Sequence, residues 1–303
     1  MKINVLVDSI EYVTGNCYQH QVINTLASNF EVRLITMPEI LSGYTVDKSP
    51  VISCLKLRTL DRSLEHLKRC LNENPVIVYE QDPWESFKDD SPYKGSYHRI
   101  AKSLNVKTFL NTSSWWSSHV RSNNLPSRFV RMGVLSSYCE HTAWQKKDIE
   151  VGFCGQIHPY RKKFFDHLSN NGINVKILPT SGYSGYLKTL SRIKIFAHCE
   201  KVDWVVEGEK IPANAMWIKD IEACARGCIS IRDYEPEYNA YGSAEDIPAK
   251  IGFQDFDHSV KTIKRLLEER SDTVDTVTYR SVEYIRENFN WLDIVTAIRE
   301  SYV

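Results

Sequence analysis

A glycine and an arginine in the segment VGFCGQIHPYRKKFFDHL (151–168) form the first candidate site. An apolar run ends at Gly155, and Arg161 stands where a helical pattern begins. A glycine lets the backbone approach a ligand closely, and a helix start beside an arginine suits a phosphate or diphosphate. One glycine is a weaker signal than a complete G-x-G-x-x-G pattern, so an ordinary strand-to-helix turn with a surface arginine remains an alternative.

A second candidate site is the segment AMWIKDIEACARGCISIRDYEPE (215–237). Lys219 and Glu222 are three residues apart on a predicted helix and therefore share a face. The carboxylate of Glu222 can accept both hydroxyls of a ribose, and Lys219 can meet phosphate charge. Gly227 is placed to end this helix in a left-handed conformation. The alternative is a surface Lys–Glu pair with no ligand.

Asp82 is the strongest candidate in the N-terminal half. It follows a buried apolar run in VIVYEQDPWE (76–85), which places a carboxylate where a strand ends. Such a carboxylate can act as a general base, although an Asp-Pro pair is also a common turn former. Gly15, in VTGN (13–16), lies in a turn after the first apolar run.

Two stretches of the N-terminal half interleave aromatic and basic residues, SPYKGSYHRIAK (91–102) and NTSSWWSSHVRSNNLPSRFVR (111–131). Aromatic rings beside Lys or Arg hold sugars, and they also hold exposed nucleic-acid bases. The candidates for such contacts are Tyr97, Arg99, Trp115 and Trp116. The alternative for each is a helix that buries one aromatic face.

The elements that position these residues alternate between short apolar runs and helical patterns, which predicts parallel sheets with helices on both faces. In the first half, strands are predicted at 2–7, 31–37, 76–80 and 106–112, and helices at 18–30, 64–71 and 96–104. In the second half, strands are predicted at 149–156, 174–179, 193–199 and 228–233, and helices at 162–170, 186–192, 215–225, 258–269, 274–287 and 292–302. The segment between the two series, 123–147, is the expected linker.

Composition narrows the class of protein. The 303 residues carry 38 Lys+Arg and 38 Asp+Glu, and this zero net charge disfavours a protein that merely coats nucleic acid. No apolar stretch approaches the roughly 18 residues of a membrane span. The eight cysteines contain no C-x-x-C pair, and the N-terminus has no signal-peptide pattern, which indicates a soluble protein of a reduced cytoplasm, or of the host cytoplasm if it is viral.

Taken together, the C-terminal segments resemble the GT-B glycosyltransferases, and more closely their spore-maturation CgeB-like branch. That branch reads roughly V-G-F-x-G-x-x-x-P-x-R, a strand like IKIFAHC, R-x-F-E-A-x-A-C-G and an acidic aromatic loop. This chain has VGFCGQIHPYR, IKIFAHC, KDIEACARG and DYEPE in the same order over residues 125–290. VIVYEQDPWE also looks like the V-Y-x-H-D segment of phage DNA α-glucosyltransferases.

The resemblance implies a nucleotide-diphosphate sugar as donor substrate, with no bound cofactor and no metal. Gly155 and Arg161 would contact the diphosphate, Lys219 would replace the usual phosphate-binding arginine, and Glu222 would bind the ribose. Gly15 would lie near the donor phosphates. In the Glu-x7-Glu pattern of the wider family the first glutamate falls at Asn214, which departs from the pattern. Asp82 would be the base for an acceptor hydroxyl, or would stabilise a cationic sugar transition state.

The expected architecture is two Rossmann-like domains facing a cleft. Residues 1–140 would form the acceptor domain, 141–285 the nucleotide-sugar domain, and 286–303 a helix crossing back to the first domain. The segment DFDH (255–258) is interpreted as a helix start, with Asp255 or Asp257 as N-cap, and not as a metal-binding D-x-D. His198 is expected to be a core or cleft-edge histidine with its hydrogen bonds satisfied.

Three functions remain open at the level of sequence. The first is a glycosyltransferase that acts on a glycan, a protein or a small molecule. The second is a phage-type enzyme that modifies a hydroxymethylated base in DNA, with Tyr97, Arg99, Trp115 and Trp116 at the acceptor. The third is a nucleotide-sugar-binding protein without catalysis, suggested by Asn214 and Lys219.

Overall fold

The structure is a computed structural model and describes residues 1–15, 17–80, 82–179, 182–200, 203–212, 218–233 and 247–302. The chain divides into two units, each with its own parallel sheet. Unit 1 contains Met1–Arg131, Trp204–Ile211 and Trp291–Val303, and unit 2 contains Met132–Asp203 and Pro212–Asn290. Unit 1 is therefore assembled from three separate segments of the sequence.

Unit 1 is built on a six-stranded parallel sheet with the strand order β2-β1-β3-β4-β5-β6. The strands are β1 (Lys2–Val7), β2 (Glu31–Thr36), β3 (Val51–Ser53), β4 (Val76–Glu80), β5 (Val106–Asn111) and β6 (Ser127–Phe129). Every residue of β3 and β4 is buried, because both faces of a parallel sheet are covered. The order reverses at β1, which makes the sheet doubly wound.

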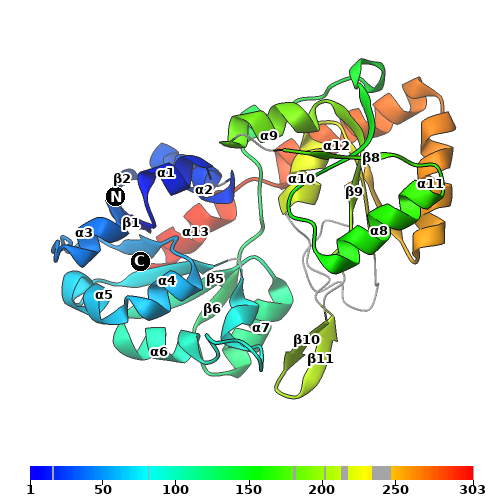
Figure 1. The fold of residues 1–303 in the computed structure, drawn as a ribbon. Coiled ribbons are helices and arrows are strands. Elements are labelled where there is room, and N and C mark those ends of the chain that lie inside the picture. Colours follow the sequence, from blue (N-terminus) through cyan, green and yellow to red (C-terminus); the bar gives the residue numbers. More distant parts are fainter. Residues whose placement is uncertain are drawn as a thin grey trace. The chain divides into compact units, whose positions relative to one another are not determined.

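Helices cover both faces of this sheet (Figure 1). On one face α13 packs against α2 and β5, and on the other α4, α5 and α6 contact one another. The helices are α1 (Ile10–Gly15), α2 (Cys17–Asn29), α3 (Met37–Leu41), α4 (Leu57–Arg62), α5 (Leu64–Leu71), α6 (Ser96–Ser103), α7 (Ser114–Ser122), α13 (Leu292–Ser301) and the 3-10 helix η1 (Pro83–Ser86).

Unit 2 repeats the same winding in a five-stranded parallel sheet with the order β13-β12-β9-β7-β8. Its strands are β7 (Ile149–Cys154), β8 (Val175–Leu178), β9 (Ile193–His198), β12 (Ile229–Asp233) and β13 (Lys250–Phe253). Here the order reverses at β7, which lies between β8 and β9.

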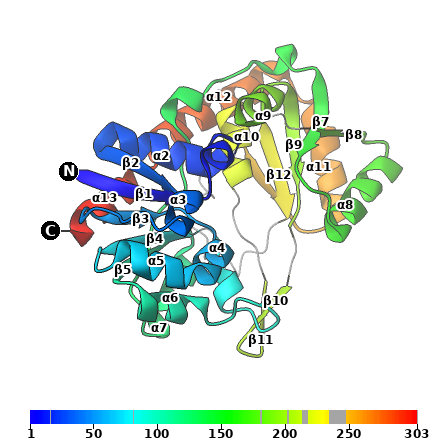
Figure 2. The same ribbon diagram turned by 60° about the vertical axis from the view of Figure 1, so that its left-hand side comes forward.

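The helices of unit 2 form two groups, with α8 and α11 in contact on one face and α9, α10 and α12 together on the other (Figure 2). Their bounds are α8 (Pro159–Asn170), α9 (Gly182–Leu190), α10 (Ile218–Ala225), α11 (Phe256–Glu268) and α12 (Ser271–Asn288), with the 3-10 helices η2 (Ser136–Tyr138) and η3 (Trp144–Lys146). None of the helices in the described part of the chain combines the length and apolar content needed to cross a bilayer.

Two helix ends confirm their sequence interpretation. Asp255 is the N-cap of α11, and its side chain accepts a hydrogen bond from the His258 amide at 2.7 Å. Gly227 follows α10 with a φ of +70°, and a Cβ there would lie 3.3 Å from the Thr142 backbone. The positive φ and the tight contact with the Thr142 backbone therefore favour glycine at this position.

A hairpin of β10 (Asp203–Val206) and β11 (Glu209–Pro212) arises between β9 and α10 in the sequence but belongs to unit 1. Asp89 joins it to the rest of that unit. The Asp89 amide donates to the Val205 carbonyl at 2.9 Å, and the Asp89 carboxylate accepts from the Gly208 amide at 2.8 Å. Val206 is buried against this contact.

The predicted α/β class with two Rossmann-like units is confirmed, and several details need correction. Strands β3, β6 and β13 and the hairpin were not predicted from the sequence. Strand β6 lies inside the expected linker, and the first segment of unit 1 ends at Arg131 and not at residue 140. The expected terminal segment 286–303 also divides, because its first residues belong to α12 of unit 2 and α13 belongs to unit 1.

Candidate functional site

In each unit, part of the candidate set lies where the carboxyl ends of the parallel strands meet. Ligands of doubly wound sheets bind beyond these ends, at the point where the strand order reverses. In unit 2 that point lies between β7 and β9 and is bordered by Gly155 and His198. In unit 1 the ends of β3 and β4 border a pocket that contains Asp82.

Gly155 and Lys219 lie together at the end of β7. Gly155 has a φ of +144°, and a Cβ built on it would lie 2.5 Å from the Lys219 ammonium nitrogen. Lys219 is half-buried, and among the residues that the structure describes it has no ion-pair partner. Its ammonium lies 5.7 Å from the centroid of the Phe153 ring. A backbone turn and an available positive charge therefore meet at one point, which suits an anion.

Arg161 stabilises the turn between β7 and α8 through contacts with buried groups. Its side chain is 4% exposed, its guanidinium lies 4.5 Å above the Phe153 ring, and it pairs with Glu200. It also donates to the carbonyls of Gln156 and, at 3.2 Å, of Cys199. These contacts tie the β7–α8 turn to the end of β9. In this arrangement the guanidinium shapes the turn, and the more accessible cation is Lys219.

A buried charge network continues from Arg161 beneath this edge. Its Nη2 lies 3.2 Å from His198 Nε2, and His198 Nδ1 lies 2.9 Å from Asp220 Oδ1. Asp220 also accepts from Arg232 at 2.9 Å, and its pKa is held well below the usual range because His198 and Arg232 outweigh the effect of its burial. The interpretation of His198 as a satisfied buried histidine is confirmed. Glu200, which completes the network, is not predicted from the sequence.

Glu222 lies one turn after Lys219 on α10 and is fully buried. The Tyr183 hydroxyl donates to its Oε1 at 2.7 Å. This bond comes from α9, which packs against α10, and it fixes the orientation of the carboxylate. The Glu222 carboxylate is therefore a buried hydrogen-bond acceptor with a fixed orientation. It is not the surface partner of Lys219 that the alternative interpretation proposed.

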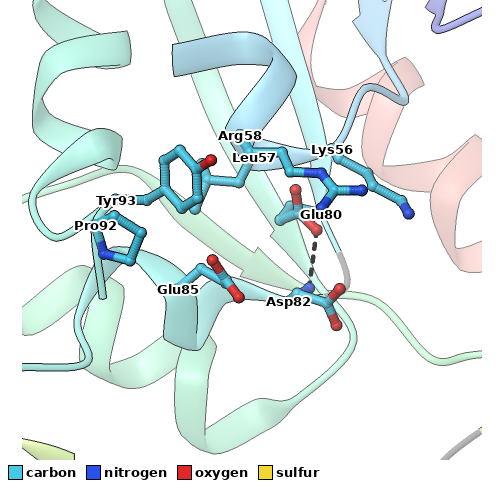
Figure 3. Close-up of a pocket in the computed structure, with 8 residues that line it drawn as sticks. All are labelled: Lys56, Leu57, Arg58, Glu80, Asp82, Glu85, Pro92 and Tyr93. Carbon is cyan, nitrogen blue, oxygen red and sulfur yellow. Dashed lines mark hydrogen bonds between the residues drawn. The ribbon is translucent and has the colours of Figure 1, made fainter. Parts of the chain in front are cut away.

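The pocket of unit 1 has a volume of about 320 Å³ and lies at the ends of β3 and β4 (Figure 3). Its acidic residues lie at the end of β4 and just after it, its basic residues follow β3, and apolar and aromatic side chains close one end. Its lining consists of Lys56, Leu57, Arg58, Glu80, Asp82, Glu85, Pro92 and Tyr93. The Asp82 amide donates to Glu80 Oε1 at 2.9 Å, which holds the chain in place where it leaves the strand.

Asp82 has the electrostatics of a proton acceptor. Burial, followed by the charge of Glu85, raises its pKa to about 6, and Lys56 and Arg58 oppose this rise. A carboxyl group with a pKa near neutrality is ionised at pH 7 and still binds a proton readily, which is the property that a general base needs.

The predicted acceptor-binding residues occupy different environments. Tyr97 is fully buried, stacks on Phe109 at 4.2 Å between centroids and donates from its hydroxyl to Asn111 at 3.1 Å. Trp116 is also fully buried. A ring without exposed surface cannot stack on a ligand, so in this structure both residues support the core, which corrects the sequence interpretation.

The other two predicted residues lie nearer the surface. Arg99 donates to the Asp61 carboxylate from Nε at 2.9 Å and from Nη2 at 2.7 Å, so its charge is paired. Trp115 is half-buried and stacks on His119 with 5.1 Å between ring centroids. The structure therefore does not bring the four residues together as one binding surface.

The structure says little about three further expectations, which concern Asn214 with the acidic aromatic loop, Gly15, and the absence of a metal. Asn214 and residues 234–246, which include most of the acidic aromatic loop, lie outside the described residues. Gly15 ends α1, which follows β1. Within the described residues, no three His, Cys, Asp or Glu side chains are grouped so that they could hold a metal ion.

Three residues of the pocket were not predicted from the sequence: Lys56, Arg58 and Glu85. Lys56 and Arg58 follow β3, and a strand of three residues leaves little periodic signal. Glu85 does have a sequence signal, since in VIVYEQDPWE it stands three residues after Asp82, within the short 3-10 helix η1.

Comparisons with known proteins place the fold. No known family's sequence profile matches the chain, and neither does any curated protein sequence. Solved structures do match it. The chain is similar to Anabaena HepE in complex with UDP and glucose, with a TM-score of 0.64, 10% identity, and coverage of 100% of this chain and 99% of HepE.

Two further structures that contain UDP-glucose are also similar. The T4 phage BGT in complex with UDP-glucose matches with a TM-score of 0.59 and 10% identity, over 99% of each chain. An α-glucosyltransferase in complex with UDP-glucose and DNA containing an abasic site matches with a TM-score of 0.56 and 10% identity, over 98% of this chain and 99% of that one. The class defined by this architecture is the doubly wound α/β protein with two Rossmann-like units. Within that class, the chain has the GT-B fold.

Proposed function

We propose that this protein is a glycosyltransferase that moves a sugar from a nucleoside-diphosphate sugar to an acceptor hydroxyl. The observation that carries the proposal is the pairing of Gly155 with the Lys219 ammonium at the switch point of unit 2, in a chain with the GT-B fold. An anion such as a diphosphate would gain both close backbone approach and a positive charge there.

Each donor-site residue has a separate role in this proposal. Lys219 stabilises the charge that develops on the leaving diphosphate, and Arg161 positions the β7–α8 turn that contacts it. Glu222, the ribose-binding residue that the resemblance implies, has no exposed surface, so in this proposal it joins α10 to α9 through Tyr183 and is assigned no ligand contact. UDP is the nucleotide we expect, because the structures of HepE and BGT contain UDP or UDP-glucose. We assign no metal ion or cofactor to the reaction.

Asp82 acts on the acceptor in unit 1. As the acceptor oxygen bonds to the anomeric carbon of the donor, its proton passes to Asp82, and the bond from that carbon to the diphosphate breaks to release the nucleoside diphosphate. The raised pKa of Asp82 suits this proton transfer near neutral pH.

The test begins with donor binding, measured by thermal stabilisation of the full chain with UDP and UDP-glucose. Lys219→Met removes the proposed charge and is expected to weaken binding about tenfold or more. Lys176→Met is the matched control, because Lys176 is exposed on β8 of the same unit. Equal weakening by both variants would contradict the assigned site.

A second measurement separates an enzyme from a binding protein. Release of UDP from UDP-glucose, with and without candidate acceptors, reports turnover. Binding of UDP-glucose without any turnover would favour the non-catalytic alternative, and the absence of both would remove the proposal's main support.

DNA with a hydroxymethylated base is a second candidate acceptor. The likeness to the T4 phage BGT and to an α-glucosyltransferase in complex with DNA favours it, as does the VYEQD segment (78–82), and the zero net charge disfavours it. Affinity for duplex DNA that falls steeply with salt, together with glucosylation of hydroxymethylated duplex, would support this acceptor.

A further inference from the structure

In the pocket that contains Asp82, the basic and the acidic side chains come from different segments. Lys56 and Arg58 come from the segment after β3, whereas Asp82 and Glu85 come from the segment after β4. Figure 3 shows Tyr93 and Pro92 at one end, with Lys56 and Asp82 toward the other. Hydrogen-bond donors therefore stand opposite acceptors, with an aromatic ring beside them.

The charge of this pocket disfavours a polyanion. Three carboxylates, those of Glu80, Asp82 and Glu85, line it together with two cations, Lys56 and Arg58, which leaves an excess of one negative charge when all are ionised (2 − 3 = −1). A phosphate placed against Asp82 would meet this excess. A neutral polyol instead donates its hydroxyls to the carboxylates and accepts from Lys and Arg.

The size and the aromatic end fit one sugar ring. At about 320 Å³ the pocket lies at the small end of the ligand-pocket range of about 300–1,000 Å³. Tyr93 is half-buried, and the guanidinium of Arg62 lies 5.5 Å from its ring centroid, which steadies the ring. A steadied aromatic ring offers an apolar surface to the C–H face of a sugar.

Three of the four residues expected to hold a DNA base are buried or ion-paired in the structure, and the fourth, Trp115, is half-buried. Tyr97 and Trp116 have no exposed surface, and Arg99 is paired with Asp61. The acidic pocket, in contrast, presents its groups around Asp82. The structure therefore favours a small neutral acceptor over a nucleic acid.

We propose that the unit 1 pocket binds a neutral sugar ring as the acceptor, with Tyr93 against the ring face and Glu85 and Arg58 selecting the hydroxyl that Asp82 deprotonates. This inference rests on the proposed glycosyl transfer. In the reaction the acceptor hydroxyl loses its proton to Asp82, its oxygen bonds to the anomeric carbon of the donor, and the nucleoside diphosphate leaves with the electrons of the broken bond.

The experiment has a binding arm that does not depend on turnover. Saturation-transfer NMR on the full chain, with glucose, galactose, mannose and N-acetylglucosamine, is expected to show contact with at least one of them. Tyr93→Ala is expected to weaken that contact about two- to tenfold, whereas Tyr93→Phe, which keeps the ring, retains it. No contact with any of the four sugars, or equal contact in parent and Tyr93→Ala, overturns the inference.

The turnover arm separates this inference from the proposed function. UDP release from UDP-glucose is measured with the same sugars, with glucose 6-phosphate and with hydroxymethylated duplex DNA, and products are identified by mass spectrometry. Transfer to a neutral sugar, with the acceptor KM raised by Arg58→Gln and the donor KM unchanged, supports the inference. Transfer only to the phosphate ester or to DNA overturns it and leaves the proposed function standing.

Discussion

Asp82→Asn is expected to stabilise the protein at neutral pH while it removes the proposed base. The folded chain binds a proton at Asp82 more tightly than the unfolded chain does, because the pKa rises from 3.8 to about 6. Stability is therefore unaffected by this group below pH 3.8 and decreases as the pH rises through 6. Asparagine does not titrate, so the stability of the variant does not decrease with pH through this position.

The size of the effect follows from the same pKa. The difference, about 6 − 3.8 or 2.2, corresponds to at most about 3 kcal/mol, and solvent screening of a half-buried carboxylate reduces this to about 1.5–3 kcal/mol. For a unit of this size the melting temperature should rise by about 3–10 °C at pH 7.5. At pH 3.5 the two proteins should melt within about 1 °C of each other, since both side chains are then neutral.

Thermal unfolding of parent and variant at both pH values is the assay. Asp90→Asn is the control, because Asp90 is exposed in the same unit and makes one surface ion pair with Lys88. Its effect should stay within about 0.5 kcal/mol at either pH. A stabilisation by Asp82→Asn that is equal at pH 3.5 and pH 7.5, or a loss of stability at pH 7.5, would refute the reasoning.

Three further variants test other parts of the structure. Gly155→Ala would place a methyl group 2.5 Å from the Lys219 ammonium and should reduce thermal stabilisation by UDP, whereas Gly172→Ala, also at positive φ but in open space, should cost only stability. Tyr97→Phe should lower the free energy of unfolding in urea by about 1–2 kcal/mol, through loss of its bond to Asn111, and an altered acceptor KM would contradict its core role. Asp220→Asn should destabilise by about 3 kcal/mol in calorimetry, because it breaks a buried ionic network, and a variant as stable as the parent would show that the network is not formed.

The parallel sheets could be predicted from the sequence because their central strands are long apolar runs. VIVYE and IKIFAHC contain enough apolar residues to stand out, and both are almost wholly buried. Strands β3 and β6 have three residues each, so their signal is no stronger than that of a loop. As a result the basic wall of the unit 1 pocket, Lys56 and Arg58, was not anticipated.

Burial was harder to predict than secondary structure at the candidate sites. Tyr97 and Ile100, three residues apart on α6, both face the core, and this spacing was a usable signal. The surroundings of Arg161 had no local signal, because Glu200 is 39 positions away in sequence. A long-range ion pair of this kind is visible only once the fold brings the two segments together.

The three-segment construction of unit 1 has a consequence for synthesis on the ribosome. Trp291 and α13 cover one face of its sheet, with the Trp291 ring centroid 6.2 Å from that of Tyr79 and with Ile294 and Ile298 fully buried. About 160 residues separate Arg131 from this cover (291 − 131), so translation at about 5–20 residues per second leaves the face bare for about 8–30 seconds. The nascent chain therefore carries an apolar sheet surface while unit 2 is made, and it offers chaperones a binding site that vanishes when α13 docks.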